Sequence, residues 1–334
     1  MTDGAKHAPQ TIGVIGSLVW DRIVDRDGRS EPVEEWGGIS YALSALSVAL
    51  PSDWRILPIV KIGRDLAEEG RRFLSEIPRT ESHGIRVVPE PNNRVELRYE
   101  TAGRRTERLR GGVPPWTWPE LGPFTEMCDA LYVNFISGFE MELETARALR
   151  MGYGGPTYAD LHSLFLGITP SGTRVPRPLE AWVSWLRCFD AVQMNEDEFE
   201  ILGGAGDPWR LAAEAMGPDL KLLTVTLGGR GAAYIVNEDL TPDPLDWRDD
   251  RRITPAPRSR SGRVAVEGLP REGDPTGCGD VWGATVFARL LAGDVLEDAM
   301  VEGNRLAGLN VVHRGARGLF RHLAGRLSHV EKHA

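Results

Sequence analysis

The sequence predicts an α/β protein built on a mostly parallel sheet. Short apolar runs are typical of buried strands and occur at 11–16, 56–63, 130–136, 190–195 and 222–228. Amphipathic stretches with helical spacing lie between them, at 40–50, 64–77, 140–151 and 196–203. Such alternation is typical of parallel strands joined by crossover helices, which bind ligands at the carboxyl ends of the strands. Glycine and polar residues follow several of these runs, in "GSLVWD", "KIGRD", "NED" and "TLGGRG", so we expect a site there.

Composition narrows the class of protein. The chain has 334 residues, 41% of them hydrophobic, which indicates one large α/β domain with a small appendage. A net charge of −9 argues against general binding to nucleic acid or anionic membranes. No apolar run reaches membrane-spanning length, and the polar start "MTDGAKHAPQ" lacks a signal-peptide run. Three cysteines without close paired spacing suit a reducing compartment, so we expect a cytoplasmic protein.

Two segments break the alternation of strands and helices. Residues 85–110 alternate apolar and charged side chains around "PNN" and "TAGR" turns, which is typical of an exposed antiparallel sheet. Together with the N-terminal segment, they predict a small β lid formed by 17–38 and 85–112. Its arginines alternate with glutamates, which indicates a solvated face rather than a nucleic-acid site. The segment 241–263 is rich in Pro, Asp and Arg and predicts an exposed connection.

The stretch "DPTGCGDVWGATVFARLLAG", residues 274–293, carries the clearest chemical signal. Gly277 and Gly279 precede a helical pattern, so their turn lies at a helix N-terminus, where N–H groups and the dipole favour an anion. A carboxylate at Asp280 would repel that anion. Phosphoryl transfer to a hydroxyl accounts for both features, because the turn stabilises the phosphate and Asp280 accepts the proton. An ordinary helix cap is the alternative interpretation.

The segment "DPTGCGD" resembles the DTxGAGD signature of the ribokinase-like (PfkB) family of sugar and nucleoside kinases. Further stretches resemble that family's motifs in its order, namely "GSLVWD" (16–21), "WGGISYALSALSVAL" (36–50), "MNEDEFEIL" (194–202), "TLGGRGAAYI" (226–235) and "GNRLAGLNVVHRGARG" (303–318). The resemblance covers nearly the whole chain. It implies a three-layer αβα sandwich with a mostly parallel central sheet and a small β lid, as a single domain over 1–334. It also implies an ATP-dependent kinase acting on a hydroxyl of a sugar, polyol or nucleoside.

The resemblance also implies roles for individual residues. Asp280 is the expected catalytic base, and the expected anion hole is the backbone of Gly277, Cys278 and Gly279. The expected substrate-binding residues are Asp21, Gly37 and Gly38. Cys278 stands where the family usually has alanine, and because it lies at the positive helix end we expect a modestly lowered thiol pKa.

On the donor side, the resemblance implies nucleotide binding by Asn195, Glu198, Thr226, Gly228, Gly231 and Asn304. Glu198 is expected to help hold Mg²⁺ through water, and Asp274 matches a position where many relatives bind a monovalent cation such as K⁺. Each has a structural alternative. Asn195 and Glu198 also suit an ordinary helix start, Asp274 suits a turn, the glycines suit a strand turn, and Asn304 suits a helix surface.

Some features depart from the family pattern or stay open. The double-glycine motif commonly continues to an asparagine, but this chain has Ala42 there, which disfavours ribokinase itself. Asp160 and His162 follow a strand-like segment without a nucleophile nearby, so we interpret both as structural. A non-catalytic nucleotide- or sugar-sensing protein is the alternative function. The expected partner is a small molecule, without nucleic acid or membrane, for a monomer or homodimer.

Overall fold

The computed structural model describes residues 9–24, 31–101, 104–202, 204, 206–248, 258–268 and 273–325. Residues 25–30 of the expected lid and 249–257 of the expected connection lie outside the described residues. Within the part that is described, no helix combines the length and the apolar character needed to cross a membrane.

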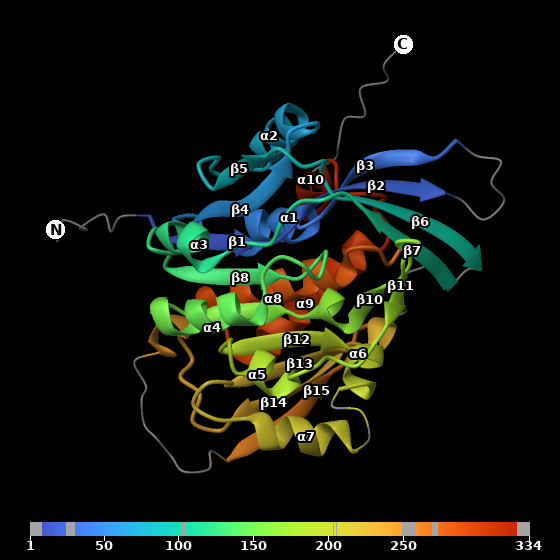
Figure 1. Ribbon diagram of the computed structural model, residues 1–334. Helices are drawn as coiled ribbons and strands as arrows, with labels where there is room; N and C mark the ends of the chain where they lie inside the picture. Colours follow the sequence, from blue (N-terminus) through green and yellow to red (C-terminus); the bar gives the residue numbers. More distant parts are fainter. Residues whose placement is uncertain are drawn as a thin grey trace.

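Nine strands form the main sheet, in the order β15-β14-β13-β12-β9-β8-β1-β4-β5 (Figure 1). Their bounds are β1 (Thr11–Ile15), β4 (Arg55–Gly63), β5 (Ile85–Val88), β8 (Ala130–Asn134), β9 (Thr157–Asp160), β12 (Ala191–Asn195), β13 (Leu222–Thr226), β14 (Ala232–Asn237) and β15 (Ser259–Val264). The strands from β5 across to β13 run parallel, and β14 and β15 pair antiparallel at one edge. The mostly parallel sheet predicted from the sequence is confirmed.

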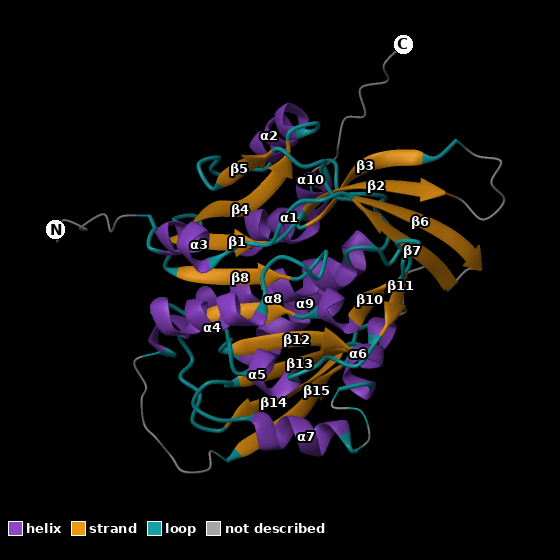
Figure 2. Cartoon of the chain, in the orientation of Figure 1, coloured by secondary structure: helices purple, strands orange, loops and turns teal. Residues whose placement is uncertain are grey.

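Helices cover both faces of this sheet (Figure 2). One apolar core includes residues of α1 (Ser40–Ala49), α2 (Ala67–Glu76), α8 (Cys278–Leu291), α9 (Leu296–Asn310) and α10 (Leu319–Leu323). The other includes residues of α3 (Trp118–Thr125), α4 (Leu143–Gly152), α5 (Trp182–Leu186), α6 (Glu196–Glu200) and α7 (Pro208–Ala215). Successive side chains of a strand point to opposite faces, so Ile56 belongs to the first core and Leu57 to the second. The predicted three-layer αβα sandwich is therefore confirmed.

A small sheet projects from the carboxyl edge of the main one, and Figure 1 shows the arrowheads of β8 and β12 pointing toward it. Its order is β3-β2-β6-β7, with β2 (Leu18–Val24), β3 (Val33–Gly38), β6 (Arg94–Thr101) and β7 (Arg104–Arg110). The pairs β2–β3 and β6–β7 are antiparallel, whereas β2–β6 is parallel. The other short elements are η1 (His162–Phe165), β10 (Leu166–Ile168), β11 (Arg174–Pro176), η2 (Gly228–Arg230) and η3 (Pro244–Asp246).

One part of the expected lid lies elsewhere. Residues 85–88 form β5, which pairs in parallel with β4 at the edge of the main sheet. Ile85 is buried there, while Arg86 and Val87 are exposed. An edge strand with solvent on one side shows the same mixture of apolar and charged residues as an exposed small sheet, which is why the sequence pattern was misleading.

Arg79 holds the C-terminal end of α1. This residue adopts the left-handed conformation, with φ of 65°. Its guanidinium donates to the carbonyls of Ser47 and Pro51, each at 2.6 Å, and to that of Leu46 at 3.3 Å. The last carbonyls of a helix lack partners within the helix, so this single side chain satisfies part of that requirement.

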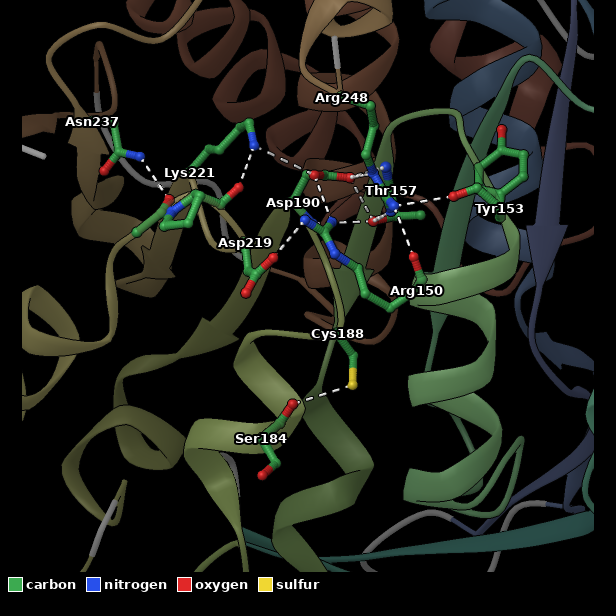
Figure 3. A network of polar contacts seen from close by, with 12 residues as sticks. Arg150, Tyr153, Thr157, Ser184, Cys188, Asp190, Asp219, Lys221, Asn237 and Arg248 are labelled. Carbon is green, nitrogen blue, oxygen red and sulfur yellow. Dashed lines mark hydrogen bonds and ion pairs between the residues drawn. The ribbon is translucent and has the colours of Figure 1, made fainter. Parts of the chain in front are cut away.

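A buried ionic network joins several elements at the amino ends of the strands (Figure 3). Asp190, which directly precedes β12, has no exposed surface and accepts from Arg150 Nη1 at 2.7 Å and from Arg248 Nε at 2.9 Å. The backbone N–H of Thr157 also donates to it, at 2.9 Å, and Lys221 Nζ lies 3.8 Å away. Burial alone would raise the pKa of Asp190, but Arg248 and Arg150 together hold that pKa below its ordinary value.

Replacing Asp190 by Asn is expected to lower the free energy of unfolding at pH 7 by about 3–5 kcal/mol, because it leaves buried cations without their counter-charge. A carboxyl group whose folded pKa is lowered stabilises the fold above its unfolded pKa and loses that effect as pH falls. The difference between wild type and Asp190→Asn should therefore shrink below about pH 4. Urea unfolding of both proteins at several pH values measures this difference in the free energy of unfolding.

Asp219 provides the matched control. It also accepts from Arg150, at 3.0 Å, but its side chain is 51% exposed. Asp219→Asn should cost less than about 1 kcal/mol. Equal losses for the two variants would contradict the role given to Asp190.

Candidate active site

A cavity of about 250 Å³ lies where the carboxyl ends of the main-sheet strands meet the small sheet. Its lining comes from β2, β6 and β7, from the ends of β9, β12 and β13, and from the N-terminus of α8. The predicted site residues in the lining are Asp21, Gly38, Asn195, Glu198, Thr226, Gly277, Gly279 and Asp280. Motifs that lie far apart in the chain therefore meet at one cavity.

The two glycines of the turn before α8 have different structural requirements. Gly277 is the N-cap in the left-handed conformation, with φ of 75°. A Cβ atom on it would lie 2.2 Å from Cδ1 of Tyr41, so the tyrosine ring fills the space that a side chain would need. At Gly279 the nearest atom to an added Cβ is Nε2 of Gln193, at 3.8 Å. Gly277 is thus required by the fold, whereas Gly279 leaves open space at the positive end of a 14-residue helix.

This difference predicts opposite results for two alanine variants. Gly277→Ala is expected to lower the free energy of unfolding by at least about 2 kcal/mol, because of the left-handed backbone and the contact with Tyr41. Gly279→Ala should change it by less than about 1 kcal/mol, because alanine suits a helical position. Urea denaturation of both proteins measures this, and similar losses for the two would show that the turn is not built in this way.

Cys278 differs from expectation in two respects. Its backbone N–H donates to the carbonyl of Pro275 at 3.1 Å, so the turn itself uses one amide of the expected anion hole. Its thiol contacts α9, where it lies 3.6 Å from the carbonyl oxygen of Ala307 and 3.3 Å from Nδ2 of Asn310. Burial raises the pKa of the Cys278 thiol to about 11, so the expectation of a lowered pKa is wrong. The side chain points from α8 toward α9 and is half-buried.

Asp280 is held by a residue that the sequence did not single out. Asn134, the last residue of β8, is buried and donates from Nδ2 to Oδ1 of Asp280 at 2.7 Å. Gln193 on β12 forms a second link, because its Nε2 donates to Gly279 O at 3.0 Å and to Asp160 Oδ2 at 2.9 Å. The start of α8 is thus tied to three neighbouring strands of the main sheet.

Asp160 and His162, which the sequence interpretation treats as structural, both line the cavity. Burial, followed by the nearby carboxylate of Asp280, raises the pKa of Asp160 to about 8. His162 Nδ1 lies 2.5 Å from Oε1 of Glu198. Withdrawal from water would lower the pKa of His162, but the Glu198 carboxylate outweighs this and raises it to about 9. The position of Asp160 at the end of a parallel strand was the available signal.

Asn195 and Glu198 serve as a helix cap and as cavity lining at the same time. Asn195 Oδ1 accepts from the backbone N–H of Glu198 at 2.9 Å, and Glu198 Oε2 accepts from that of Asn195 at 2.8 Å. Glu198 Oε1 accepts from Nδ2 of Asn195 at 2.6 Å, in addition to its contact with His162. The structural interpretation of this pair is therefore correct, and it does not remove the pair from the site.

The small-sheet end of the cavity holds the expected substrate residues. Asp21 is only 6% exposed, and a Cβ on Gly37 would lie 1.8 Å from its Oδ2, so Asp21 packs directly against a glycine. Gly38 has φ of 62°. Val19, Val95 and Leu97 form an apolar wall beside Asp21.

Several predicted residues lie away from the cavity lining, namely Gly37, Gly228, Gly231, Asp274, Cys278 and Asn304. Asn304 is bonded inside the protein: its Oδ1 accepts from Trp282 Nε1 at 2.9 Å, and its Nδ2 donates to Ala265 O at 3.2 Å. Gly231 has φ of 95°, and a Cβ there would lie 2.0 Å from Val264 O. Asp274 Oδ1 accepts from the backbone N–H of Thr276 at 2.9 Å, which is the expected turn.

No protein-family model matches the chain, and no curated protein matches its sequence. Several solved structures match most of it. A putative ribokinase II from E. coli, in complex with ATP and Mg²⁺, is 16% identical, with 92% of this chain and 94% of that chain covered and a TM-score of 0.68. Ribokinase from Thermotoga maritima is 18% identical, with 95% and 98% covered and a TM-score of 0.67. A pyrophosphate-dependent kinase in the ribokinase family, complexed with a pyrophosphate analogue and myo-inositol, is 20% identical, with 91% and 96% covered and a TM-score of 0.65.

The chain is thus an α/β sandwich with a cavity at the carboxyl edge of its parallel strands. More particularly, it has the ribokinase fold, as the sequence resemblance implied. At 16–20% identity this likeness shows the fold alone.

Proposed function

We propose that the protein is a kinase that transfers the γ-phosphate of ATP to a hydroxyl of a sugar, polyol or nucleoside. The observation that carries this proposal is the place of Asp280 in the cavity, beside the glycine turn at the N-terminus of α8. A carboxylate at a helix end that favours anions suits a reaction in which a hydroxyl loses its proton as it meets a phosphate. A protein that only sensed a nucleotide or sugar would have no need of this base.

The neighbours of Asp280 support a role as base. Asn134 donates to one carboxylate oxygen and so limits the rotation of the carboxyl group. Burial and the neighbouring Asp280 raise the pKa of Asp160, which favours its protonated form and reduces the repulsion between the two carboxyl groups. The proposed anion hole is the backbone of residues 277–279, where Gly277 and Gly279 line the cavity and the N–H of Cys278 already donates to the carbonyl of Pro275. The open space at Gly279 leaves room for the phosphoryl group, and the α8 dipole favours its negative charge.

We place the donor phosphates at the end of the cavity formed by Asn195, Glu198 and Thr226. Mg²⁺ usually keeps several waters and binds through substrate phosphates, where it offsets their charge. Glu198 Oε2, with one hydrogen bond from Asn195 N, fits a water of such an ion. Among the described residues, no group of three or more His, Cys, Asp or Glu side chains could hold a metal ion by itself.

Other assignments from the sequence stay predictions. Nucleotide contacts by Gly228, Gly231 and Asn304 have weaker support, since all three lie away from the cavity lining. A monovalent cation beside Asp274 also stays a prediction. Burial raises the pKa of the nearby Glu35, while Arg314 and Arg317 act to lower it and Asp274 adds a smaller upward effect. We also propose that the small sheet closes over the cavity as a lid, within a single domain. Cytoplasmic location and a monomeric or homodimeric state remain expectations.

Pyrophosphate is the second candidate donor. The amide of Asn304 is bonded within the protein rather than turned to the cavity, and one structural neighbour is described as pyrophosphate-dependent. Turnover with ATP and with pyrophosphate should therefore be compared. Use of pyrophosphate alone would keep the phosphotransfer proposal and contradict its nucleotide part.

The proposal is tested by Asp280→Asn. This variant should bind ADP with nearly unchanged affinity in calorimetry while losing about 10²–10⁴-fold in kcat, because the amide cannot take the hydroxyl proton. The matched control is Asp298→Asn, which changes an exposed aspartate in the first turn of α9. Near-normal kcat in Asp280→Asn on the best acceptor would overturn the proposed function.

A change at Asp21 is expected to weaken binding of the acceptor and to leave binding of the donor unchanged. Asp21→Asn keeps the shape that fits against Gly37, but its amide accepts fewer hydrogen bonds from neighbouring hydroxyls. We expect the KM for the acceptor to rise at least about ten-fold, with the KM for the donor little changed. Steady-state kinetics with each substrate varied in turn measures this, and a parallel rise in both KM values would point to a folding role instead.

A further inference from the structure

The charge of the cavity lining restricts the acceptor. Among the described residues, five lining side chains are carboxylic, namely Asp21, Glu107, Asp160, Glu198 and Asp280, and two are cationic, namely His162 and Arg174. His162 is engaged by Glu198 at the donor-phosphate end. Among the described lining residues, Arg174, on β11, is the one cationic side chain at the small-sheet end of the cavity. The groups around Arg174 therefore decide whether this end can bind an anion.

Both Nη atoms of Arg174 already have partners within the protein. Its side chain is 5% exposed, and its Nη2 donates to the carbonyls of Ile136 and Ser137 at 2.7 and 2.8 Å. Its Nη1 lies 3.4 Å from Oε2 of Glu107, on strand β7 of the small sheet. Its Nε is buried without a hydrogen-bond partner, so the guanidinium is held through its two Nη atoms, and the carboxylate of Glu107 offsets its charge before any ligand enters.

We propose that the acceptor is an uncharged, monocyclic polyhydroxylated compound, such as a hexose or a cyclitol, without a phosphate or carboxylate group. An anionic acceptor would add negative charge beside Asp21 and Glu107 with no uncompensated cation among the described lining residues to meet it. Uncharged hydroxyls, in contrast, can donate to these carboxylates. This inference rests on the proposed kinase function and narrows its acceptor class.

The shape of the same end supports a small ring rather than a nucleoside. Val19, Val95, Leu97 and Ile136 give an aliphatic wall, against which the C–H face of a pyranose or cyclitol can pack. Tyr41, the one Phe, Tyr or Trp side chain among the described lining residues, is packed against Gly277.

Matched pairs of ligands test this proposal on the wild-type protein. The neutral members are glucose, fructose and myo-inositol, and the anionic members are glucuronate, fructose 6-phosphate and myo-inositol 1-phosphate, with inosine as the nucleoside. Calorimetry measures binding without a donor, and donor consumption measures turnover. At least one neutral compound should bind about ten-fold or more tightly than its anionic counterpart and than inosine. Tighter binding of an anionic member, or of inosine, would overturn the proposal.

A variant tests the charge argument directly. Glu107→Gln removes the carboxylate that offsets Arg174, so the ratio of anionic to neutral affinity should rise about ten-fold within each pair. The double variant Glu107→Gln with Arg174→Gln should return the ratio toward the wild-type value. Glu96→Gln is the matched control, because Glu96 pairs with Arg22 on the neighbouring strand and does not line the cavity. An unchanged ratio in a folded Glu107→Gln protein would contradict the role of the Arg174–Glu107 pair.

The outcomes separate this inference from the proposed function. Turnover that needs Asp280 but prefers an anionic acceptor or inosine would leave the kinase proposal intact and reject the acceptor class. Selective binding of neutral rings without phosphate transfer from ATP or pyrophosphate would reject the kinase proposal and keep the selectivity of the cavity. No binding of any neutral compound would reject the acceptor class.

Discussion

The hydrogen bond between Asn134 and Asp280 joins the N-terminus of α8 to the end of β8, and the geometry of the cavity depends on that junction. Gln193 reinforces it from β12 by bonding to both Gly279 and Asp160. Tyr41 on α1 packs against the other side of the turn and fixes where the helix begins. Because each contact joins elements far apart in sequence, the helix end acquires its place only when the sheet is assembled.

The two ends of the main sheet each contain a buried aspartate, and the pKa values of these two residues are shifted in opposite directions. At the amino ends, Asp190 is completely buried yet stays ionised, because Arg150 and Arg248 contact it and hold its pKa low. At the carboxyl ends, burial and the neighbouring Asp280 raise the pKa of Asp160. Desolvation raises the pKa of both groups, and the neighbouring charges then decide whether the net shift is downward, as at Asp190, or upward, as at Asp160. The first arrangement stabilises the fold, and the second limits repulsion inside the cavity.

Sequence patterns were sufficient for the sheet, its two helical layers and the glycine turn, because apolar periodicity and helix-start signals are local. Asn134 could not be found in this way, since it stands inside the apolar run "ALYVNFI" and its role depends on a partner 146 residues away. Arg174 follows an irregular segment with no periodic signal. The sequence correctly predicts that Cys278 lies at the N-terminus of a helix. The direction of its thiol depends on the packing of α9, which a local motif does not indicate.

Arg79 lies roughly thirty residues beyond the C-terminal end of α1, yet its guanidinium donates to the carbonyls of Ser47 and Pro51 there. The carbonyls at the end of α1 therefore gain these partners only when β4 and α2 have brought this guanidinium back. Partial opening of that segment releases these carbonyls to water together with the strand pairing. The end of α1 is thereby coupled to the segment that carries Arg79, and local opening of either one removes the same hydrogen bonds.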